Sequence, residues 1–426
     1  MKADWKPEPD RSDLLRIERL NSFLHDKILN VVVEKGQAVV KATSYVGILK
    51  IGKTTLQILP KVDKDNEGLA VQNLLYLLSY TKKLPIKESD IAHLTEKQTE
   101  FFEILVYLFA KNLWDLIRKG MYKEYVAEEE YAGFLKGKWL ISQQLTQRPT
   151  NRHNFYVSYD DFTEDNSFNR IFKYAVIRLQ KISTDARNQQ LLLELSFALN
   201  DIEFEKITKE HFARLNVNRL NRQYLPVLEL ARLFILNSSL QMTANNIETF
   251  AFVFDMNKLF EEFVFEFIRR HRDEILPGEL KDCDIKAQSG NKYLVYSEDG
   301  NPVFRLQPDI MFIKPDGSIP LIIDTKYKIL DSQDKNNGIS QADMYQMFAY
   351  VKKYECKMVI MLYPHREGVE EKRFKLDKEG IQRIDMKTIN IGIDLRQDKE
   401  ALITQFKLAV KMKGQEEGYV HLDPNL

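Results

Sequence analysis

The residues whose types and spacing best suit chemistry are two aspartates and a lysine in the segment 306–327. Two apolar runs in this segment flank Asp316-Gly317, a dipeptide that favours tight turns between antiparallel strands. If Asp316-Gly317 forms a two-residue turn, the numbers of paired residues sum to 633, and Asp309 lies directly opposite Asp324. Lys326 follows Asp324 by two residues, so it projects from the same face of the strand.

Two facing carboxylates at the end of an apolar hairpin repel each other, so they favour a cation between them. Oxygen ligands of this kind suit Mg²⁺ or Mn²⁺. With Lys326 beside them to position water or to stabilise charge on phosphorus, Asp309 and Asp324 could support phosphodiester hydrolysis. The alternative is a surface hairpin with a salt bridge. The pattern Pro308-Asp309 followed by Asp324-Thr325-Lys326 resembles the signature of the PD-(D/E)xK nucleases.

That resemblance implies an acidic residue on a helix ahead of the hairpin. The helix expected over 255–270 offers Glu261, Glu262 and Glu266. At about 100° per residue, Glu262 and Glu266 fall in a polar sector, whereas Glu261 falls between apolar residues. A carboxylate in apolar surroundings needs a partner, so Glu261 is the expected third metal ligand beside Asp309 and Asp324. The alternative is an exposed helix charge.

A second helix is expected to begin near Gln341, after the hairpin. It carries Gln346 and Tyr350, whose Q-x-x-x-Y spacing resembles that of RecB-like nucleases. Residues four apart share a helical face, so Gln346 and Tyr350 could hold a DNA phosphate or the attacking water. Ordinary amphipathic packing is the alternative explanation.

The segment Gly47–Thr54 matches the phosphate-loop pattern G-x-x-x-x-G-K-[ST]. A working phosphate loop needs a helix that starts at Gly52-Lys53, because the helix N-terminus supplies the anion site. The following residues alternate, are rich in β-branched types and end at Pro60, which predicts a β-hairpin instead. We therefore expect no nucleotide binding here.

The elements that must position these residues fall into three expected regions. Residues 1–120 predict an α+β N-terminal region, and 121–245 predict a mostly helical middle region that begins with loops and short strands over 131–166. Residues 246–426 combine an aromatic-rich helix, short strands and further helices, which is typical of an α/β domain.

Composition excludes several classes of protein. The chain has 426 residues with 62 basic and 62 acidic side chains, so its net charge neither requires nor excludes nucleic acid. Its 2 cysteines are too few for a disulfide framework or a cysteine-built zinc site, and no apolar run approaches the ~18 residues of a membrane span. The charged residues at the start contain no apolar signal segment, which predicts a cytoplasmic location.

Taken together, these motifs resemble the McrC family, the nuclease subunits of McrBC-type modification-dependent restriction systems. The resemblance rests on segments along most of the chain, which include 45–47, 58–62, 137–138, 165–166, 169–170 and 256–261.

This resemblance implies a PD-(D/E)xK restriction-endonuclease-like domain over 246–426, with a mixed central sheet and with Asp309, Asp324, Lys326, Glu261, Gln346 and Tyr350 as its site. It also implies a Mg²⁺-dependent endonuclease for double-stranded DNA that carries modified cytosine. The implied partner is a McrB-type AAA+ GTPase hexamer, which residues 1–120 would contact. The alternative is a non-catalytic assembly factor that activates an AAA+ ring and only holds DNA.

Overall fold

The computed structural model describes residues 18, 21, 27–34, 37–51, 54–60, 66–81, 84, 86–88, 91, 94, 100–147, 153–237, 240–242, 247–328, 330–376 and 381–412. The chain forms two compact units, and each combines segments that are distant in sequence. Unit 1 contains 1–47, 57–99 and 253–426, and unit 2 contains 48–56 and 100–252. This division differs from the three consecutive regions expected from the sequence, because residues 57–99 pack with the C-terminal segment.

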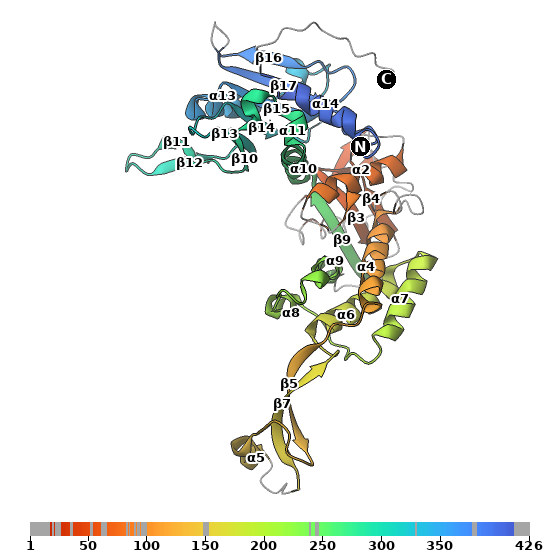
Figure 1. The fold of residues 1–426 in the computed structure, drawn as a ribbon. Helices are drawn as coiled ribbons and strands as arrows, with labels where there is room; N and C mark the ends of the chain where they lie inside the picture. The colour runs from red at the N-terminus through yellow and green to blue at the C-terminus, as the bar shows by residue number, and fades with distance from the viewer. Residues whose placement is uncertain are drawn as a thin grey trace. The chain divides into compact units, whose positions relative to one another are not determined.

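Unit 1 is built around a mixed six-stranded sheet of order β10-β13-β14-β15-β17-β16 (Figure 1). The central pairs β14–β15 and β15–β17 are parallel, and the outer pairs are antiparallel. Every residue of β14 and β15 is buried, as expected for strands covered on both faces. The strands are Asp284–Ala287 (β10), Ile310–Ile313 (β13), Leu321–Thr325 (β14), Met358–Pro364 (β15), Lys372–Lys375 (β16) and Arg383–Ile389 (β17).

Helices α13 (Gln341–Tyr354) and α10 (Met256–Arg270) cover this sheet. Met347, Tyr350 and Val351 of α13 pack in one cluster with alternate strand residues, among them Ile322 and Val359. α10 also contacts β14, yet none of its buried residues belongs to that cluster. The two helices therefore lie against opposite faces of the sheet. The remaining C-terminal helices are α11 (Arg272–Ile275), α12 (Gly278–Lys281), η3 (Lys335–Gly338) and α14 (Lys399–Ala409).

Helix α2 (Glu67–Tyr80) explains why an N-terminal segment belongs to unit 1. Tyr80 packs edge-on against Phe263 of α10, and its hydroxyl lies 3.2 Å from His271 Nε2. Asn73 is buried, and its amide donates to the backbone carbonyls of Ile391 and Ile393 at 3.1 and 2.8 Å. The Asn73 contacts join residues more than 300 positions apart, and the Tyr80 contacts join residues more than 180 apart, so the order of the sequence gives no sign of them.

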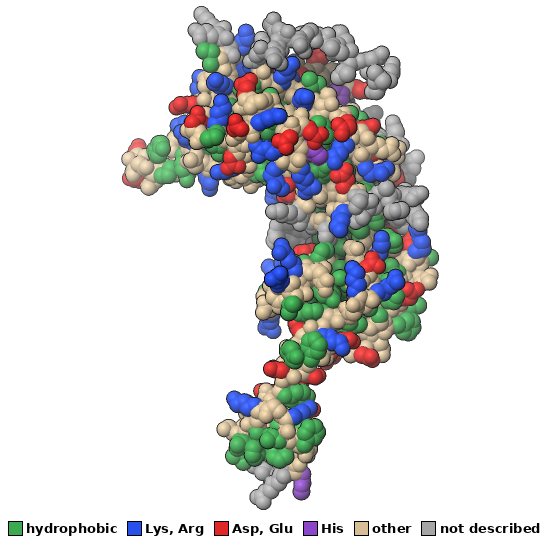
Figure 2. Space-filling model, in the orientation of Figure 1, with side chains coloured by type: hydrophobic (Ala, Val, Ile, Leu, Met, Phe, Trp, Pro, Cys, Tyr) green, Lys and Arg blue, Asp and Glu red, His purple; other side chains and the backbone are tan. Residues whose placement is uncertain are grey.

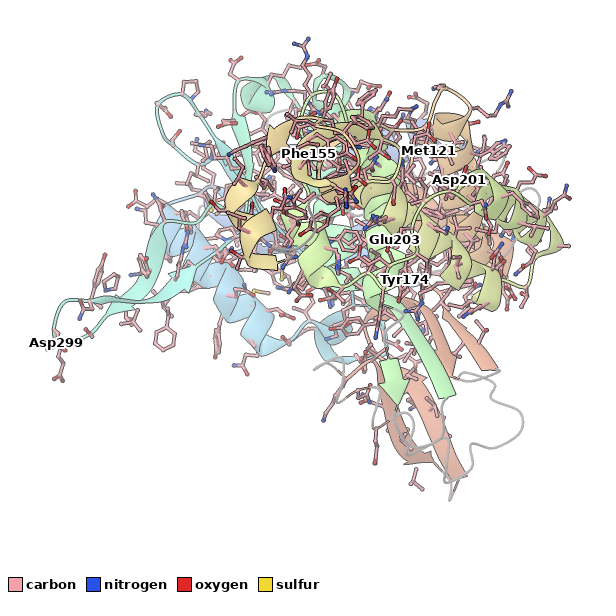
Figure 3. The ribbon with its side chains drawn as sticks, turned by 90° about the horizontal axis from the view of Figure 1, so that it is seen from below. Met121, Phe155, Tyr174, Asp201, Glu203 and Asp299 are labelled. Atoms are coloured by element: carbon pink, nitrogen blue, oxygen red, sulfur yellow. The ribbon has the colours of Figure 1, made fainter. Side chains whose placement is uncertain are left out.

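A separate hairpin, β11 (Lys292–Tyr296) and β12 (Pro302–Leu306), projects from the sheet of unit 1 (Figure 1). Asp299 lies at its far end (Figure 3). The Tyr354 hydroxyl donates to the Leu306 carbonyl at 3.0 Å and so ties the base of the hairpin to α13. β12 leads directly into Gln307-Pro308-Asp309, so the base of this hairpin is fixed close to Asp309.

Unit 2 combines a helical core with a long two-stranded ribbon that extends away from it (Figure 1). The helices are α4 (Phe101–Ile117), α6 (Ser167–Ile182), α7 (Ala186–Ala198), α8 (Lys209–Arg214), η2 (Arg222–Tyr224) and α9 (Leu225–Asn237). Within the core, the buried Glu103 carboxylate accepts hydrogen bonds from Ser183 Oγ, the Thr184 amide and Asn188 Nδ2 at 2.7, 2.8 and 2.7 Å. This single side chain joins α4 to the connection between α6 and α7.

The ribbon corrects the expected loops and short strands over 131–166. β5 (Glu124–Ala132) and β7 (Phe155–Thr163) pair along nine residues each, and β6 (Lys138–Trp139) and α5 (Ile141–Gln147) lie at the far end. Most residues of β5 are exposed, so its sequence lacks the apolar–polar alternation that marks a half-buried strand. Hydrophobic side chains gather on the far end of the ribbon (Figure 2), and those exposed there include Phe134, Leu135, Trp139, Ile141 and Leu145.

The N-terminal strands test whether the segment that matches the phosphate-loop pattern, Gly47–Thr54, is part of a β-hairpin. β1 (Leu29–Glu34) pairs with β2 (Gln37–Ala42), and a second sheet has the order β4-β3-β9-β8. Its strands are Tyr45–Ile51 (β3), Thr54–Ile58 (β4), Leu240–Met242 (β8) and Ile247–Asp255 (β9). A phosphate loop would continue into a helix at this point, but Thr54 is the first residue of strand β4, which is the neighbour of β3 in the sheet. The predicted hairpin is therefore confirmed. Gly52 and Lys53 lie outside the described residues.

Among the helices in the described part of the chain, none is both long and apolar enough to cross a membrane.

Candidate functional site

The hairpin of β13 and β14 has the register predicted from the sequence. Ile310 pairs with Ile323 and Phe312 pairs with Leu321, so the numbers of paired residues sum to 633. This register continues to Asp309, which is the residue before β13, and to Asp324 within β14. The two aspartates therefore occupy opposing positions on adjacent strands.

The turn that joins these strands differs from the prediction. The Lys314 carbonyl accepts from the Gly317 amide at 2.9 Å, so the turn is centred on Pro315-Asp316 and Gly317 follows it with φ +84°. A two-residue turn at Asp316-Gly317 is thus wrong. Lys314 then pairs with Ser318, and Phe312 pairs with Leu321. The strand that follows the turn therefore has one residue more than the strand before it, at Ile319-Pro320. This bulge, which contains a proline without an N–H, restores the predicted register.

Asp309 is held by the end of the neighbouring strand. Its Oδ2 accepts hydrogen bonds from the Thr325 amide and the Thr325 hydroxyl at 2.7 and 2.8 Å. Burial nevertheless raises the pKa of Asp309 above the ordinary value for an aspartate. Asp309 is therefore a fixed carboxylate for which ionisation is costly.

Asp324 is buried more deeply, with only 1% of its surface exposed. Burial, and secondly the charge of Asp309, raise the pKa of Asp324 from 3.8 to about 7. Its Oδ2 forms an ion pair with Lys326 Nζ at 2.8 Å, whereas Oδ1 is buried with no hydrogen-bond partner in the described part of the chain. A buried carboxylate oxygen without a partner, beside a second carboxylate, is an arrangement that a divalent cation would compensate.

Lys326 connects the carboxylates to α13. Its Nζ donates to Gln346 Oε1 at 3.3 Å, Gln346 Nε2 lies 2.8 Å from the Tyr350 hydroxyl, and that hydroxyl donates to the Gln307 carbonyl at 3.1 Å. Burial lowers the pKa of Lys326, but the charge and the hydrogen bond of Asp324, with the charges of Asp309 and Asp343, together raise it above the ordinary value for a lysine. Gln346 and Tyr350 thus share a helical face as predicted, and the buried Tyr350 holds the backbone two residues before Asp309.

Glu261 is less directly connected to this site. It lies on α10, on the face of the sheet opposite α13, and its Oε1 accepts from Gln288 Nε2 at 2.6 Å. Within the described residues, no three His, Cys, Asp or Glu side chains form a group that could hold a metal ion. The structure therefore brings together Asp309, Asp324, Lys326, Gln346 and Tyr350, whereas Glu261 contacts Gln288, whose backbone amide donates to the Asp309 carbonyl at 2.9 Å.

Three further residues belong to the site but were not identified from the sequence. Thr325 lies inside the Asp324-Thr325-Lys326 motif, so its proximity was evident although its bonds to Asp309 were not. Asp343, in the first turn of α13, is close enough for its charge to raise the pKa of both Asp324 and Lys326. Its spacing from Gln346 and Tyr350, at i, i+3 and i+7, was the available signal. Gln288 has no recognisable motif around it.

Comparisons with known proteins agree with the resemblance seen in the motifs. The family model of the McrBC 5-methylcytosine restriction system component matches residues 40–364. A search among curated proteins finds no match.

Two solved structures are similar to this chain. One is a chain of the refined half-complex from the tetradecameric assembly of Thermococcus gammatolerans McrB AAA+ hexamers with bound McrC. It has a TM-score of 0.67 and 25% identity, and the match covers 94% of this chain and 90% of that one. The other is from the cryo-EM structure of the Thermococcus gammatolerans McrBC complex, with a TM-score of 0.48, 30% identity and coverage of 64% and 76%.

Proposed function

Because the chain belongs to the McrBC family of 5-methylcytosine restriction system components, we propose that it is the nuclease subunit of such a system and that it hydrolyses phosphodiester bonds of double-stranded DNA carrying modified cytosine. The observation that carries this proposal is the Asp309–Asp324 pair, in which a buried carboxylate oxygen has no partner in the described part of the chain. A pair that served only stability would lose free energy by this arrangement.

Asp309 and Asp324 are the residues that would hold Mg²⁺ or Mn²⁺, and Glu261 is the proposed third ligand. The chemistry that a bound divalent cation supplies there is neutralisation of charge on the phosphate and a lower pKa for water. Lys326 offers N–H donors beside Asp324, so it can orient the attacking water and stabilise negative charge on phosphorus. Gln346 and Tyr350 fix the lysine and the Gln307 backbone, which limits the freedom of both.

We also propose that the chain acts with a McrB-type AAA+ GTPase hexamer and stimulates its GTP hydrolysis. Support comes from the similarity, over 94% of this chain, to a chain of the Thermococcus gammatolerans assembly of McrB AAA+ hexamers with bound McrC. In this scheme the partner recognises the modified base, and the chain itself binds no nucleotide.

The test combines the purified chain, its AAA+ partner, GTP, Mg²⁺ and a methylated plasmid, and it measures strand cutting and GTP hydrolysis in the same tube. Asp324→Ala is the test variant. Asp299→Ala, at the exposed end of the β11–β12 hairpin, is the matched control. We expect the wild type and Asp299→Ala to cut, and Asp324→Ala to stimulate GTP hydrolysis normally without cutting.

Two outcomes would change the assignment. Equal cutting by the wild type and Asp324→Ala would remove the carboxylate pair from the mechanism. Absence of cutting by either protein, with GTPase stimulation retained, would favour the non-catalytic assembly factor over the nuclease.

A further inference from the structure

The β11–β12 hairpin leaves the sheet at the end where the carboxylate pair lies. It connects β10, which ends at Ala287, with β13, which starts directly after Asp309. Asp324 is the last residue but one of β14, and β14 is antiparallel to β13, so Asp324 lies at this end too. A large molecule that binds at the carboxylate pair therefore meets the base of the hairpin.

The base of the hairpin is fixed to α13, the helix that contacts Lys326. The Tyr354 hydroxyl donates to the Leu306 carbonyl at 3.0 Å and accepts from the Lys292 amide at 3.3 Å, so it holds both strands. Gly290 packs so closely against β12 that a Cβ on it would overlap the Leu306 carbonyl oxygen. The direction in which the hairpin leaves the sheet is therefore set by contacts within unit 1.

One face of the hairpin is apolar beyond Lys292, and it changes from buried to exposed along its length. Because side chains alternate along β11, Leu294 and Tyr296 share the face of Lys292 and of its partner Leu306. Leu306 is buried in one cluster with residues of α13, but the exposed fractions of Leu294 and Tyr296 are 40% and 66%. Hydrophobic side chains lie along the projecting hairpin, and acidic side chains lie at its end (Figure 2).

Phe304 is the most exposed aromatic residue of the hairpin, with an exposed fraction of 70%. Its neighbours in β12, Val303 and Arg305, pair with β11, but Phe304 itself has φ +58°. A left-handed conformation is a genuine outlier for a bulky residue, and such strain persists mainly at functional sites. Neither the exposure nor the strain stabilises unit 1, which indicates that the hairpin binds another molecule.

The position and the shape of the hairpin favour DNA as this molecule. Phe304 precedes Asp309 by five residues, which span at most about 18 Å. Double-stranded DNA bound for cutting at Asp309 extends beyond the cut bond on both sides, so it passes within reach of Phe304. The major groove is wide enough to admit a two-stranded β-ribbon, and apolar side chains in it can contact the methyl groups of bases.

Charge divides the hairpin into two halves. Lys292 and Arg305 are exposed near its base, where they can contact phosphates. Glu298 and Asp299 are exposed at its end, where phosphates would repel them. The DNA should therefore lie against the half of the hairpin that is nearer to the carboxylate pair.

We propose that the β11–β12 hairpin is a DNA-binding element, which places Leu294, Tyr296 and Phe304 in a groove of the double-stranded substrate beside the bond to be cut. The proposal rests on the proposed function, because it takes the Asp309–Asp324 pair as the place of cutting. It adds a surface of this chain that positions the substrate at that pair.

The first experiment identifies the molecule that Phe304 contacts in the working complex. Phe304 is replaced by the photoreactive p-benzoylphenylalanine in the full chain carrying Asp324→Ala, so that the DNA stays intact. This protein is irradiated with the AAA+ partner, GTP, Mg²⁺ and methylated double-stranded DNA. The same photoreactive residue in place of Leu408, which is 51% exposed on α14, is the matched control. We expect crosslinks to DNA from position 304 and none from position 408.

The second experiment measures strand cutting and GTP hydrolysis in the same tube, at a DNA concentration below saturation. Phe304→Asn removes the ring and introduces a residue that tolerates the left-handed backbone, and Tyr296→Ala removes the other exposed ring. Because contacts between aromatic side chains and bases commonly change affinity by about 10-fold or more, we expect each variant to cut about 10-fold more slowly. GTP hydrolysis should be stimulated normally, and Leu408→Ala should cut like the wild type. Thermal unfolding checks that each variant is folded.

The possible results are distinguishable. Absence of DNA crosslinks from position 304, with or without crosslinks to the AAA+ partner or to a second copy of this chain, would overturn the proposal about the hairpin. Normal cutting by folded Phe304→Asn and Tyr296→Ala would overturn it too, and both results leave the proposed function intact. Equal cutting by the wild type and Asp324→Ala would instead refute the proposed function, whereas crosslinks from position 304 would still place DNA against the hairpin.

Discussion

Replacing Asp324 by its neutral isostere should stabilise unit 1 when no divalent cation is present. The pKa of Asp324 is raised from 3.8 to about 7, mainly by burial and then by the charge of Asp309. Each pKa unit corresponds to about 1.4 kcal/mol, so keeping this group ionised costs the fold about 4 kcal/mol at alkaline pH. Asp324→Asn removes that cost, and about 4 kcal/mol is the upper limit of the expected gain.

The pH dependence follows from the direction of the shift. Because the pKa of Asp324 is higher in the folded state, the folded state binds more protons between about pH 4 and pH 7. The free energy of unfolding of the wild type therefore falls as the pH rises through this window. The advantage of Asp324→Asn should be absent near pH 4, grow up to about pH 7 and stay constant above it.

Labelling of Cys356 by a thiol reagent is a suitable assay. Cys356 is fully buried in the same cluster as Ile322 and Val359, and burial raises the pKa of its thiol to about 12, so it reacts when unit 1 opens. At pH 8.5 a gain of about 4 kcal/mol would slow labelling by about 10³-fold, and Asp299→Asn should leave the rate unchanged. Faster labelling of Asp324→Asn, or an advantage that does not vary with pH, would refute the reasoning.

Three other predictions follow from particular contacts. Lys326→Ala should bind Mn²⁺ in calorimetry yet cut no DNA, because Lys326 acts on water and phosphate; loss of Mn²⁺ binding in a folded variant would mean that its role is misassigned. Glu103→Ala should lower the free energy of unfolding of unit 2 by about 3 kcal/mol in urea denaturation, since two buried donors and the part-buried Thr184 amide lose their acceptor, whereas the exposed Glu128→Ala should change it little. The isolated chain should bind no labelled GTP, with or without Lys53→Ala, because Thr54 begins a strand; tight binding that depends on Lys53 would contradict this.

The sequence predicted elements whose signals are local. The helix expected over 255–270 is Met256–Arg270 with Asp255 as its N-cap, and the helix expected from Gln341 starts there with Ser340 as its N-cap. Both have apolar residues at helical spacing and a capping side chain, which are features of the segment itself. The facing positions of Asp309 and Asp324 were also predicted, although the turn was misplaced by one residue and a bulge compensated for the error.

Tertiary arrangement explains what the sequence did not predict. Helical periodicity placed Glu261 among apolar neighbours, but it could not show that α10 and α13 lie on opposite faces of the sheet. Gln288 precedes Asp309 by 21 residues, across a projecting hairpin, and only the pairing of β10 with β13 brings the two together. The ribbon of β5 and β7 was missed because most of β5 is exposed and most of β7 is only half-buried, so neither strand has the clear apolar–polar alternation of a strand with one buried face.

The central claim is that Asp309 and Asp324 form a divalent-cation site. Anomalous X-ray diffraction at the manganese absorption edge, from crystals of the full chain soaked in Mn²⁺, tests this claim most directly. We expect an anomalous peak between the two carboxylates, within about 2.0–2.3 Å of an oxygen of each, and no such peak in crystals of Asp324→Ala. A well-occupied peak elsewhere with none at this pair, or an unchanged peak in Asp324→Ala, would contradict the account.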